Sequence, residues 1–205
     1  MMLLSNKVAI ITGASSGIGR AAAKLFASEG ARLVICARRA EPLEQLATEI
    51  RDEGGEVLVV AGDVAQEQTH EACVIAAEGT YGSVDIAFNN AGTVGTMRPL
   101  AEMGSSEWNH VVQTNLTAAF LGAKAQVPAI LKRGAGSLIF TGSFVGNSVG
   151  LPGMAAYGAA KAGLMGLVKG LTADYAAQGI RANALLPGGT ATAMAGDAEQ
   201  REGGA

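Results

Sequence analysis

The sequence has little of what stabilises or targets many other classes of protein. Its two cysteines, Cys36 and Cys73, are too few for a disulfide framework or a cysteine zinc site. Charged residues make up only 16% of the chain, and the net charge of −3 offers no basic surface for nucleic acid. No run approaches the roughly 18 apolar residues of a membrane span, and residues 1–7 lack the order of a signal peptide. We therefore expect a cytoplasmic protein with neither nucleic-acid nor membrane partners.

Histidine is as scarce as cysteine, which argues against a metal centre. His70 and His110 lie in polar helical contexts, without other ligands at metal-binding spacing. We expect no metal site and two solvated imidazoles.

Glycine and apolar residues are abundant instead. The 29 glycines among 205 residues are about twice the usual share of ~7%, which indicates many tight turns. Hydrophobic residues make up 49% of the chain, enough for one large packed core. We expect a single domain over residues 1–192, followed by a small, polar and flexible end at 193–205.

Short apolar runs alternate with longer amphipathic segments. The runs are nearly continuous in apolar residues, as in parallel strands with both faces covered. The expected strands are residues 8–12, 32–37, 57–61, 84–88, 137–141 and 180–186. The expected helices are residues 17–28, 42–53, 67–80, 105–132 and 155–178. This alternation predicts an α/β fold with a doubly wound parallel sheet.

A glycine-rich turn follows the first expected strand. Residues 12–19 read Thr-Gly-Ala-Ser-Ser-Gly-Ile-Gly and lead directly into a helix. Glycines allow backbone N–H groups to approach a pyrophosphate, and the helix N-terminus adds partial positive charge. The spacing G-x-x-x-G-x-G differs from G-x-G-x-x-G, so a tight turn without any ligand remains the alternative.

The end of the second expected strand bears on the choice of cofactor. An acidic residue there accepts the ribose hydroxyls of NAD, but this sequence reads Cys36-Ala37-Arg38-Arg39. A guanidinium at Arg38 favours the extra 2′-phosphate of NADP. The residues favour NADP(H) and leave NAD(H) open, and a merely solvated arginine is the alternative.

A tyrosine and a lysine share one face of the last expected helix. Tyr157 and Lys161 are four residues apart. A nearby cation favours the phenolate, so we expect the pKa of Tyr157 to be lowered and the phenol to exchange protons. Ser143 follows the expected strand 137–141, where its hydroxyl can bond a substrate carbonyl. A surface Tyr–Lys pair is the ordinary alternative.

The order of these segments is more specific than any one of them. Residues 12–19 are followed by Asn89-Asn90-Ala91-Gly92, Asn115, Ser143, the Tyr157–Lys161 pair and Pro187-Gly188. In this order the chain resembles the short-chain dehydrogenase/reductase family over residues 7–192. The resemblance implies a Rossmann-like fold and an oxidoreductase that transfers hydride between NAD(P)(H) and a small carbonyl or alcohol substrate.

The resemblance also implies a role for each matching residue. Tyr157 would be the general acid and base, Lys161 would hold the nicotinamide ribose, and Ser143 would orient the carbonyl. Asn115 would support a water-linked proton path. The residues that would bind the cofactor are Gly13, Ser15, Ser16, Gly17, Ile18, Gly19, Arg38, Asp63, Val64, Asn90, Ala91, Gly92, Tyr157, Lys161, Pro187, Gly188 and Thr190. Among them, Asp63 and Val64 would meet the adenine.

The same resemblance raises an expectation about the end of the chain. The family usually continues through a substrate-covering segment and a seventh strand, so the sequence is interpreted as C-terminally truncated after Ala205. Two alternatives therefore stay open: a dinucleotide-binding fragment with little or no catalysis, and a structural partner protein. The resemblance further implies a homodimer through helices 105–132 and 155–178, with strand 180–186 left at an open sheet edge.

Overall fold

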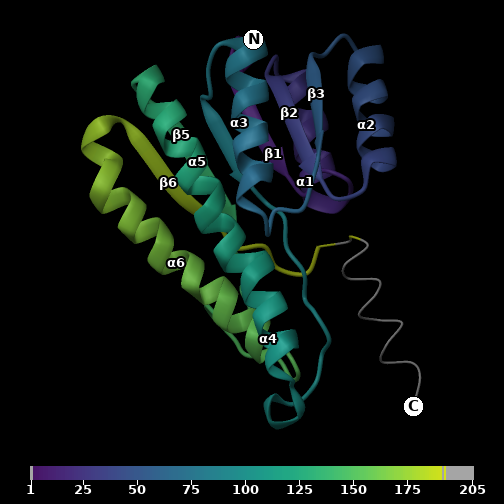
Figure 1. The fold of residues 1–205 in the computed structure, drawn as a ribbon, viewed down its shortest axis with the longest axis vertical. Helices are drawn as coiled ribbons and strands as arrows, with labels where there is room; N and C mark the ends of the chain where they lie inside the picture. The colour runs from purple at the N-terminus through teal and green to yellow at the C-terminus, as the bar shows by residue number, and fades with distance from the viewer. Residues whose placement is uncertain (1, 191, 193–205) are drawn as a thin grey trace.

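Parallel pairing joins every strand of the sheet to its neighbours. The computed structural model describes residues 2–190 and 192, and in this part six strands lie in the order β3-β2-β1-β4-β5-β6 (Figure 1). The strands are β1 (Val8–Thr12), β2 (Arg32–Ala37), β3 (Val57–Ala61), β4 (Ile86–Asn89), β5 (Gly136–Thr141) and β6 (Ile180–Leu185). The expected doubly wound α/β sheet is confirmed. The expected flexible end at 193–205 lies outside the described residues.

Helices cover both faces of this sheet. The α-helices are α1 (Gly17–Ser28), α2 (Ala40–Asp52), α3 (Glu67–Tyr81), α4 (Ser105–Val112), α5 (Ala118–Arg133) and α6 (Ala155–Tyr175). One apolar core packs α1 and α2 against β1 and β2, and a second packs α3, α5 and α6 against the other face (Figure 1). Alternate residues of β1 enter opposite cores, Ala9 and Ile11 in one and Val8 and Ile10 in the other. This explains why the strand reads as continuously apolar.

Several expected boundaries differ from the structure. Residues 105–132 do not form one regular helix, because the π-helical segment η2 (Gln113–Thr117) separates α4 from α5. The Asn115 amide donates a hydrogen bond to the Val111 carbonyl at 2.8 Å, so a side chain takes a bond that the helix would make. Residues 155–178 divide into α6 and a 3₁₀ turn, η3 (Ala176–Gln178). The fourth strand begins at Ile86 rather than at residue 84.

The chain winds outward in two directions from the centre of the sheet. β1 pairs with β2 on one side and with β4 on the other, so the strand order reverses between β1 and β4. In open α/β sheets ligands bind beside the carboxyl ends of the strands at this reversal. Thr12 and Asn89, the last residues of these strands, mark that place.

The strand β6 forms one edge of the described sheet, as expected. It pairs with β5 over Ile180–Leu185. Ile180 and Ala182 are buried, whereas Leu185 is 48% exposed. Within the described residues, no helix is long and apolar enough to span a membrane.

Candidate active site

The glycine-rich turn brings the backbone of residues 13–19 against the end of β4. Gly13 has φ +68°, and a Cβ on it would lie 2.8 Å from the Ala91 Cα atom. A Cβ on Gly19 would overlap the Gly13 carbonyl oxygen and lie 2.6 Å from the Asn90 side chain. Both positions therefore require glycine, one because of its positive φ and both because of close approach.

Three strand ends are joined by the side chains of Thr12 and Asn90. The Asn90 backbone N–H donates to the Thr12 hydroxyl at 3.0 Å, and the Asn90 amide donates to the Thr12 carbonyl at 3.1 Å. The Thr141 hydroxyl donates to the side-chain oxygen of Asn90 at 3.0 Å. These bonds fix the carboxyl ends of β1, β4 and β5 relative to one another.

The N-terminus of α1 is suited to an anion. Ser16 occupies the N-cap position, and its side chain makes no capping hydrogen bond to any described residue. The first turn, residues 17–20, reads Gly-Ile-Gly-Arg and contains no acidic residue. The N–H groups of residues 17–19 and the partial positive charge of the helix are thus available to a phosphate, whereas the Arg20 N–H donates to the Ser16 carbonyl at 3.2 Å.

The residues expected at the adenosine end follow β2 and β3. Arg38 is exposed directly after β2, while Asp63 is exposed and Val64 is buried after β3. The Gly62 N–H donates to the Ala37 carbonyl at 3.0 Å, which holds the two strand ends together. The structure therefore places these residues beside one another, on the β2–β3 side of the glycine-rich turn.

Ser143, Tyr157 and Lys161 meet beyond the carboxyl end of β5. Their exposed fractions are 6%, 9% and 3%. The Lys161 ammonium donates to the Thr141 carbonyl at 2.6 Å and lies 5.6 Å from the centre of the Tyr157 ring. The Ser143 hydroxyl accepts a bond from the Val145 N–H at 3.1 Å, which fixes its orientation. A phenol, a hydroxyl and an ammonium thus share one largely buried site.

The electrostatics of this site differ from the expectation. Burial raises the pKa of Tyr157, and a hydrogen bond with Ser143 offsets only part of this effect. Desolvation lowers the pKa of Lys161 to about 8. The expected lowering of the pKa of Tyr157 is therefore wrong, because the lysine directs its ammonium at a neutral carbonyl and is itself destabilised by burial. The two pKa values therefore move apart, and that of Lys161 falls below that of Tyr157.

Asn115 lies in η2, where it contacts the segment after β4. Its amide donates to the Thr93 carbonyl at 2.7 Å, and its side-chain oxygen accepts from the Thr93 N–H at 3.2 Å. A Cβ on Gly92 would lie 2.6 Å from this oxygen and 3.2 Å from the Lys161 ammonium nitrogen. Gly92 therefore keeps Asn115 and Lys161 adjacent.

The residues after β6 approach the Ser143 loop. The Phe144 N–H donates to the Pro187 carbonyl at 3.3 Å. Gly188 and Thr190 are exposed, and the Thr190 hydroxyl donates to the Gly188 carbonyl at 3.3 Å. The segment expected at the nicotinamide thus lies beside the loop that carries Ser143.

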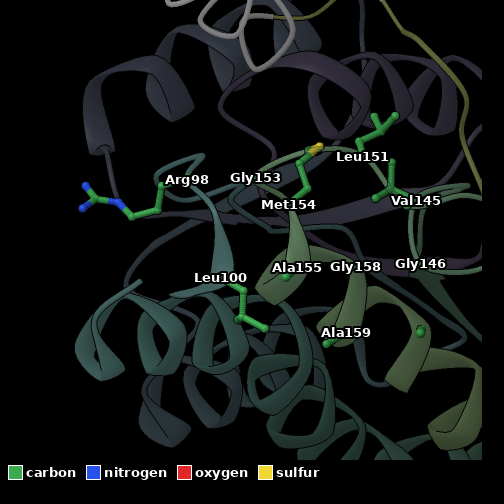
Figure 2. Close-up of a pocket in the computed structure, with 12 residues that line it drawn as sticks. Arg98, Leu100, Val145, Gly146, Leu151, Gly153, Met154, Ala155, Gly158 and Ala159 are labelled. Atoms are coloured by element: carbon green, nitrogen blue, oxygen red, sulfur yellow. The ribbon is translucent and has the colours of Figure 1, made fainter. Parts of the chain in front are cut away.

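A further cavity lies on another face of α6. It has a volume of about 390 Å³, and α6 contributes Ala155, Gly158, Ala159 and Ala162 to its lining. At 100° per residue these positions point well away from Tyr157. Figure 2 shows Met154 and Leu151 on one side of the cavity and Arg98 extending outward from it. This cavity is therefore separate from the Ser143–Tyr157–Lys161 site.

Sequence reasoning missed two polar residues that build this region. Thr12 and Thr141 hold Asn90, and the Thr141 carbonyl also holds Lys161. A backbone acceptor leaves no signal in the sequence.

The expectation of a solvated His70 is wrong. Its side chain is 2% exposed, and its Nε2 bonds the Val64 carbonyl at 2.9 Å.

Comparisons with known proteins agree with this architecture. The model of the short chain dehydrogenase family matches residues 7–203. Cyclohexanol dehydrogenase of Acinetobacter sp. (strain SE19) is 36% identical over 198 residues, which cover 97% of this chain and 78% of that enzyme. The A-factor type gamma-butyrolactone 1′-reductase of Streptomyces virginiae is 38% identical over 95% of this chain and 76% of its own. The crystal structure of levodione reductase superimposes with a TM-score of 0.93 at 34% identity, covering 97% of this chain and 78% of that one.

The family match and relatives named as dehydrogenases and reductases identify the doubly wound chain as an oxidoreductase. The chain belongs to the short-chain dehydrogenase family.

Proposed function

We propose that this protein transfers a hydride between NADP(H) and a small carbonyl or alcohol substrate. The observation that carries the proposal is the buried group of Ser143, Tyr157 and Lys161 beside the carboxyl ends of β4 and β5. It adjoins an uncapped helix N-terminus suited to a pyrophosphate. A phenol next to an ammonium and a hydroxyl suits proton exchange with an oxygen atom.

The residues present fit such a cofactor. Gly13 and Gly19 leave no room for a Cβ, so the backbone of the turn offers its N–H groups at short range. Arg38 would hold the 2′-phosphate, Asp63 and Val64 would meet the adenine, and Asn90 with Gly92 would line the adenosine side. Pro187, Gly188 and Thr190 would contact the carboxamide.

When bound, the nicotinamide supplies or accepts the hydride. Because burial raises its pKa, Tyr157 is protonated at neutral pH and donates its proton to the substrate oxygen during reduction. The Ser143 hydroxyl donates a second hydrogen bond to the same oxygen as charge develops on it. Lys161 holds the ribose hydroxyls, and Asn115 supports the water-linked path that returns a proton to Tyr157.

The test replaces the proton donor and keeps its ring. Tyr157→Phe is expected to lower kcat by about 10²–10⁴-fold while NADPH binds with unchanged Kd. Tyr175→Phe removes a hydroxyl from the other end of α6 and serves as the matched control. The assay follows NADPH absorbance with a panel of alcohols and ketones, led by cyclohexanol and cyclohexanone because a relative is named for cyclohexanol. Full turnover by the Tyr157→Phe protein would contradict the assignment, and cofactor binding without turnover of any substrate by the unchanged protein would favour a binding fragment.

We also propose that the protein forms a homodimer through the faces of α4, α5 and α6. Large apolar side chains are exposed there, with Phe120 at 50% and Trp108 at 37%. The cavity on α6 is lined mainly by apolar groups. Sedimentation analysis of the unchanged protein and of Phe120→Glu is expected to show a dimer and a monomer, respectively. A monomer in both cases would contradict the proposal.

A further inference from the structure

His70 on α3 is a buried polar side chain outside the proposed catalytic group. It is 2% exposed, and its Nε2 lies 2.9 Å from the Val64 carbonyl oxygen. Because a carbonyl only accepts, Nε2 carries the proton and Nδ1 is left as an acceptor. No described residue donates a hydrogen bond to Nδ1. A buried acceptor without a donor costs folding free energy, so this nitrogen requires a partner.

A small cavity adjoins this imidazole. Its volume is about 10 Å³, close to what one water molecule requires on the same measure. Its polar lining comes from Thr12, His70, Asn89, Asn115 and Thr141. The cavity therefore combines the size of one water molecule with polar walls.

Gly122 on α5 keeps the space beside the imidazole open. A Cβ at this position would lie 3.2 Å from His70 Nδ1 and 2.5 Å from the Asn89 side-chain oxygen. Asn89 and Gln126 donate to each other at 2.8 and 3.1 Å, so each amide is already engaged. The space next to Nδ1 is thus bounded by groups that have other partners.

Thr12 supplies a free donor to the same cavity. Its hydroxyl oxygen accepts from the Asn90 N–H at 3.0 Å and from the Ala91 N–H at 3.2 Å. With both lone pairs engaged, the hydroxyl proton is left over, and it has no acceptor among the described hydrogen bonds of the chain. One cavity is therefore lined both by Thr12, which has an unused donor, and by His70, which has an unused acceptor. A water molecule can satisfy both at once.

We propose that this cavity binds one internal water molecule, which accepts from the Thr12 hydroxyl and donates to His70 Nδ1, and that His70 is thereby a positioning residue for the cofactor site. Through Nε2 the imidazole holds Val64, at the adenine side, and through the water it is joined to Thr12, which holds Asn90 at the phosphate side. This positioning role rests on the proposed cofactor site. The water site does not.

The water site is tested by a double-mutant cycle on unfolding, without cofactor. His70→Gln keeps an N–H donor near the Nε2 position and removes the Nδ1 acceptor, and Thr12→Val removes the hydroxyl. The two changes are expected to be non-additive by about 3- to 10-fold in the unfolding equilibrium constant, the worth of one hydrogen bond. In the control cycle, Thr172→Val on the exposed side of α6 is expected to add to His70→Gln within 2-fold. Additive effects of Thr12→Val and His70→Gln would overturn the proposal.

A measurement on the unchanged protein covers the case in which a variant does not fold. A crystal structure at high resolution is expected to show a water oxygen within 2.7–3.2 Å of both His70 Nδ1 and the Thr12 hydroxyl. Nitrogen chemical shifts of the imidazole are expected to report the Nε2–H tautomer. A direct protein donor to Nδ1, or the Nδ1–H tautomer, would overturn the proposal.

The positioning role is tested by the split between cofactor affinity and turnover. His70→Gln disrupts the water link, and His70→Asn disrupts the bond to Val64. Each is expected to raise the Kd of adenosine 2′,5′-bisphosphate and of NADPH by about 3- to 10-fold, the worth of one hydrogen bond, with kcat at saturating cofactor unchanged. The bisphosphate carries no nicotinamide, so this readout is independent of the redox reaction. Unchanged Kd values in both variants would overturn the positioning role.

Discussion

The buried ammonium of Lys161 is expected to lower the free energy of unfolding of the protein. Its side chain is 3% exposed, and its ammonium donates to one neutral carbonyl at 2.6 Å. Burial lowers its pKa from 10.5 to about 8. At 1.36 kcal/mol per pH unit this difference is ~3 kcal/mol. Lys161→Met keeps the length of the side chain and loses a hydrogen bond worth ~1 kcal/mol, so it is expected to stabilise the protein by ~2 kcal/mol at pH 7.

The stabilisation expected from Lys161→Met depends on pH. Below about pH 8 the lysine is charged in both the folded and the unfolded chain, so the folded state bears the whole cost. Between about pH 8 and 10.5 the folded protein has released a proton that the unfolded chain retains, so the free energy of unfolding rises with pH. The advantage of Lys161→Met over the unchanged protein is therefore expected to shrink steadily across this range.

Urea unfolding at pH 7, 8, 9 and 10 measures both quantities. Lys169→Met, an exposed change on the same helix, is the matched control and is expected to leave the free energy of unfolding nearly unchanged at every pH. At neutral pH the melting temperature of Lys161→Met is expected to rise by ~4–8 °C, while turnover falls to background. A Lys161→Met protein that is less stable at pH 7, or whose difference from the unchanged protein does not vary with pH, would refute the reasoning.

Three further outcomes are expected elsewhere in the chain. Arg38→Ala is expected to weaken NADPH by about 10- to 150-fold, the worth of charged hydrogen bonds, and to leave NADH nearly unchanged; equal losses in a fluorescence titration would make the arginine a bystander. Burial raises the pKa of Asp85, but a hydrogen bond from the β1 backbone and two nearby cations outweigh this effect, so the pKa is lowered. Asp85→Asn is therefore expected to reduce the free energy of unfolding by ~1–3 kcal/mol at pH 7 and to have no effect below the pKa of the folded carboxyl. Urea unfolding over a range of acid pH measures this difference. Gly146 has φ +87° and faces the backbone of α6, whereas Gly150 has open space around it. Gly146→Ala is expected to reduce the free energy of unfolding by ~1–3 kcal/mol, and Gly150→Ala is expected to leave it almost unchanged. Similar values for both variants in thermal unfolding would contradict the steric reasoning.

The sheet could be predicted from the sequence because both of its faces are buried. The first three strands are apolar except for Thr12 and Arg32, and their bounds and those of α1 match the expected ranges. The interruption of the helix 105–132 could not be predicted in the same way. Its cause is a hydrogen bond from the Asn115 side chain to Val111, together with bonds to Thr93. Apolar periodicity carries no information about such contacts.

The proposed site was accessible to sequence reasoning where it consists of side chains in ordered motifs. Tyr157, Lys161 and Ser143 lie together, but the direction of the pKa of Tyr157 was not predictable, because it depends on burial. The polar neighbours of His70 along the chain predict a solvated side chain. Its burial follows from the Val64 carbonyl and from the space left by Gly122, which only the folded chain brings together.

The central position of β1 has a consequence for how the chain is made. Its pairing with β2 can form early, but Ala9 pairs with Ile86 across the other edge, 77 positions later in the sequence. At 5–20 residues per second on a ribosome, that edge waits ~4–15 s for its partner. The exposed segment reads Val-Ala-Ile-Ile-Thr, apolar and rich in β-branched residues, and an unpaired edge of this kind readily associates with other chains. The central strand of the finished sheet is thus prone to aggregation during synthesis.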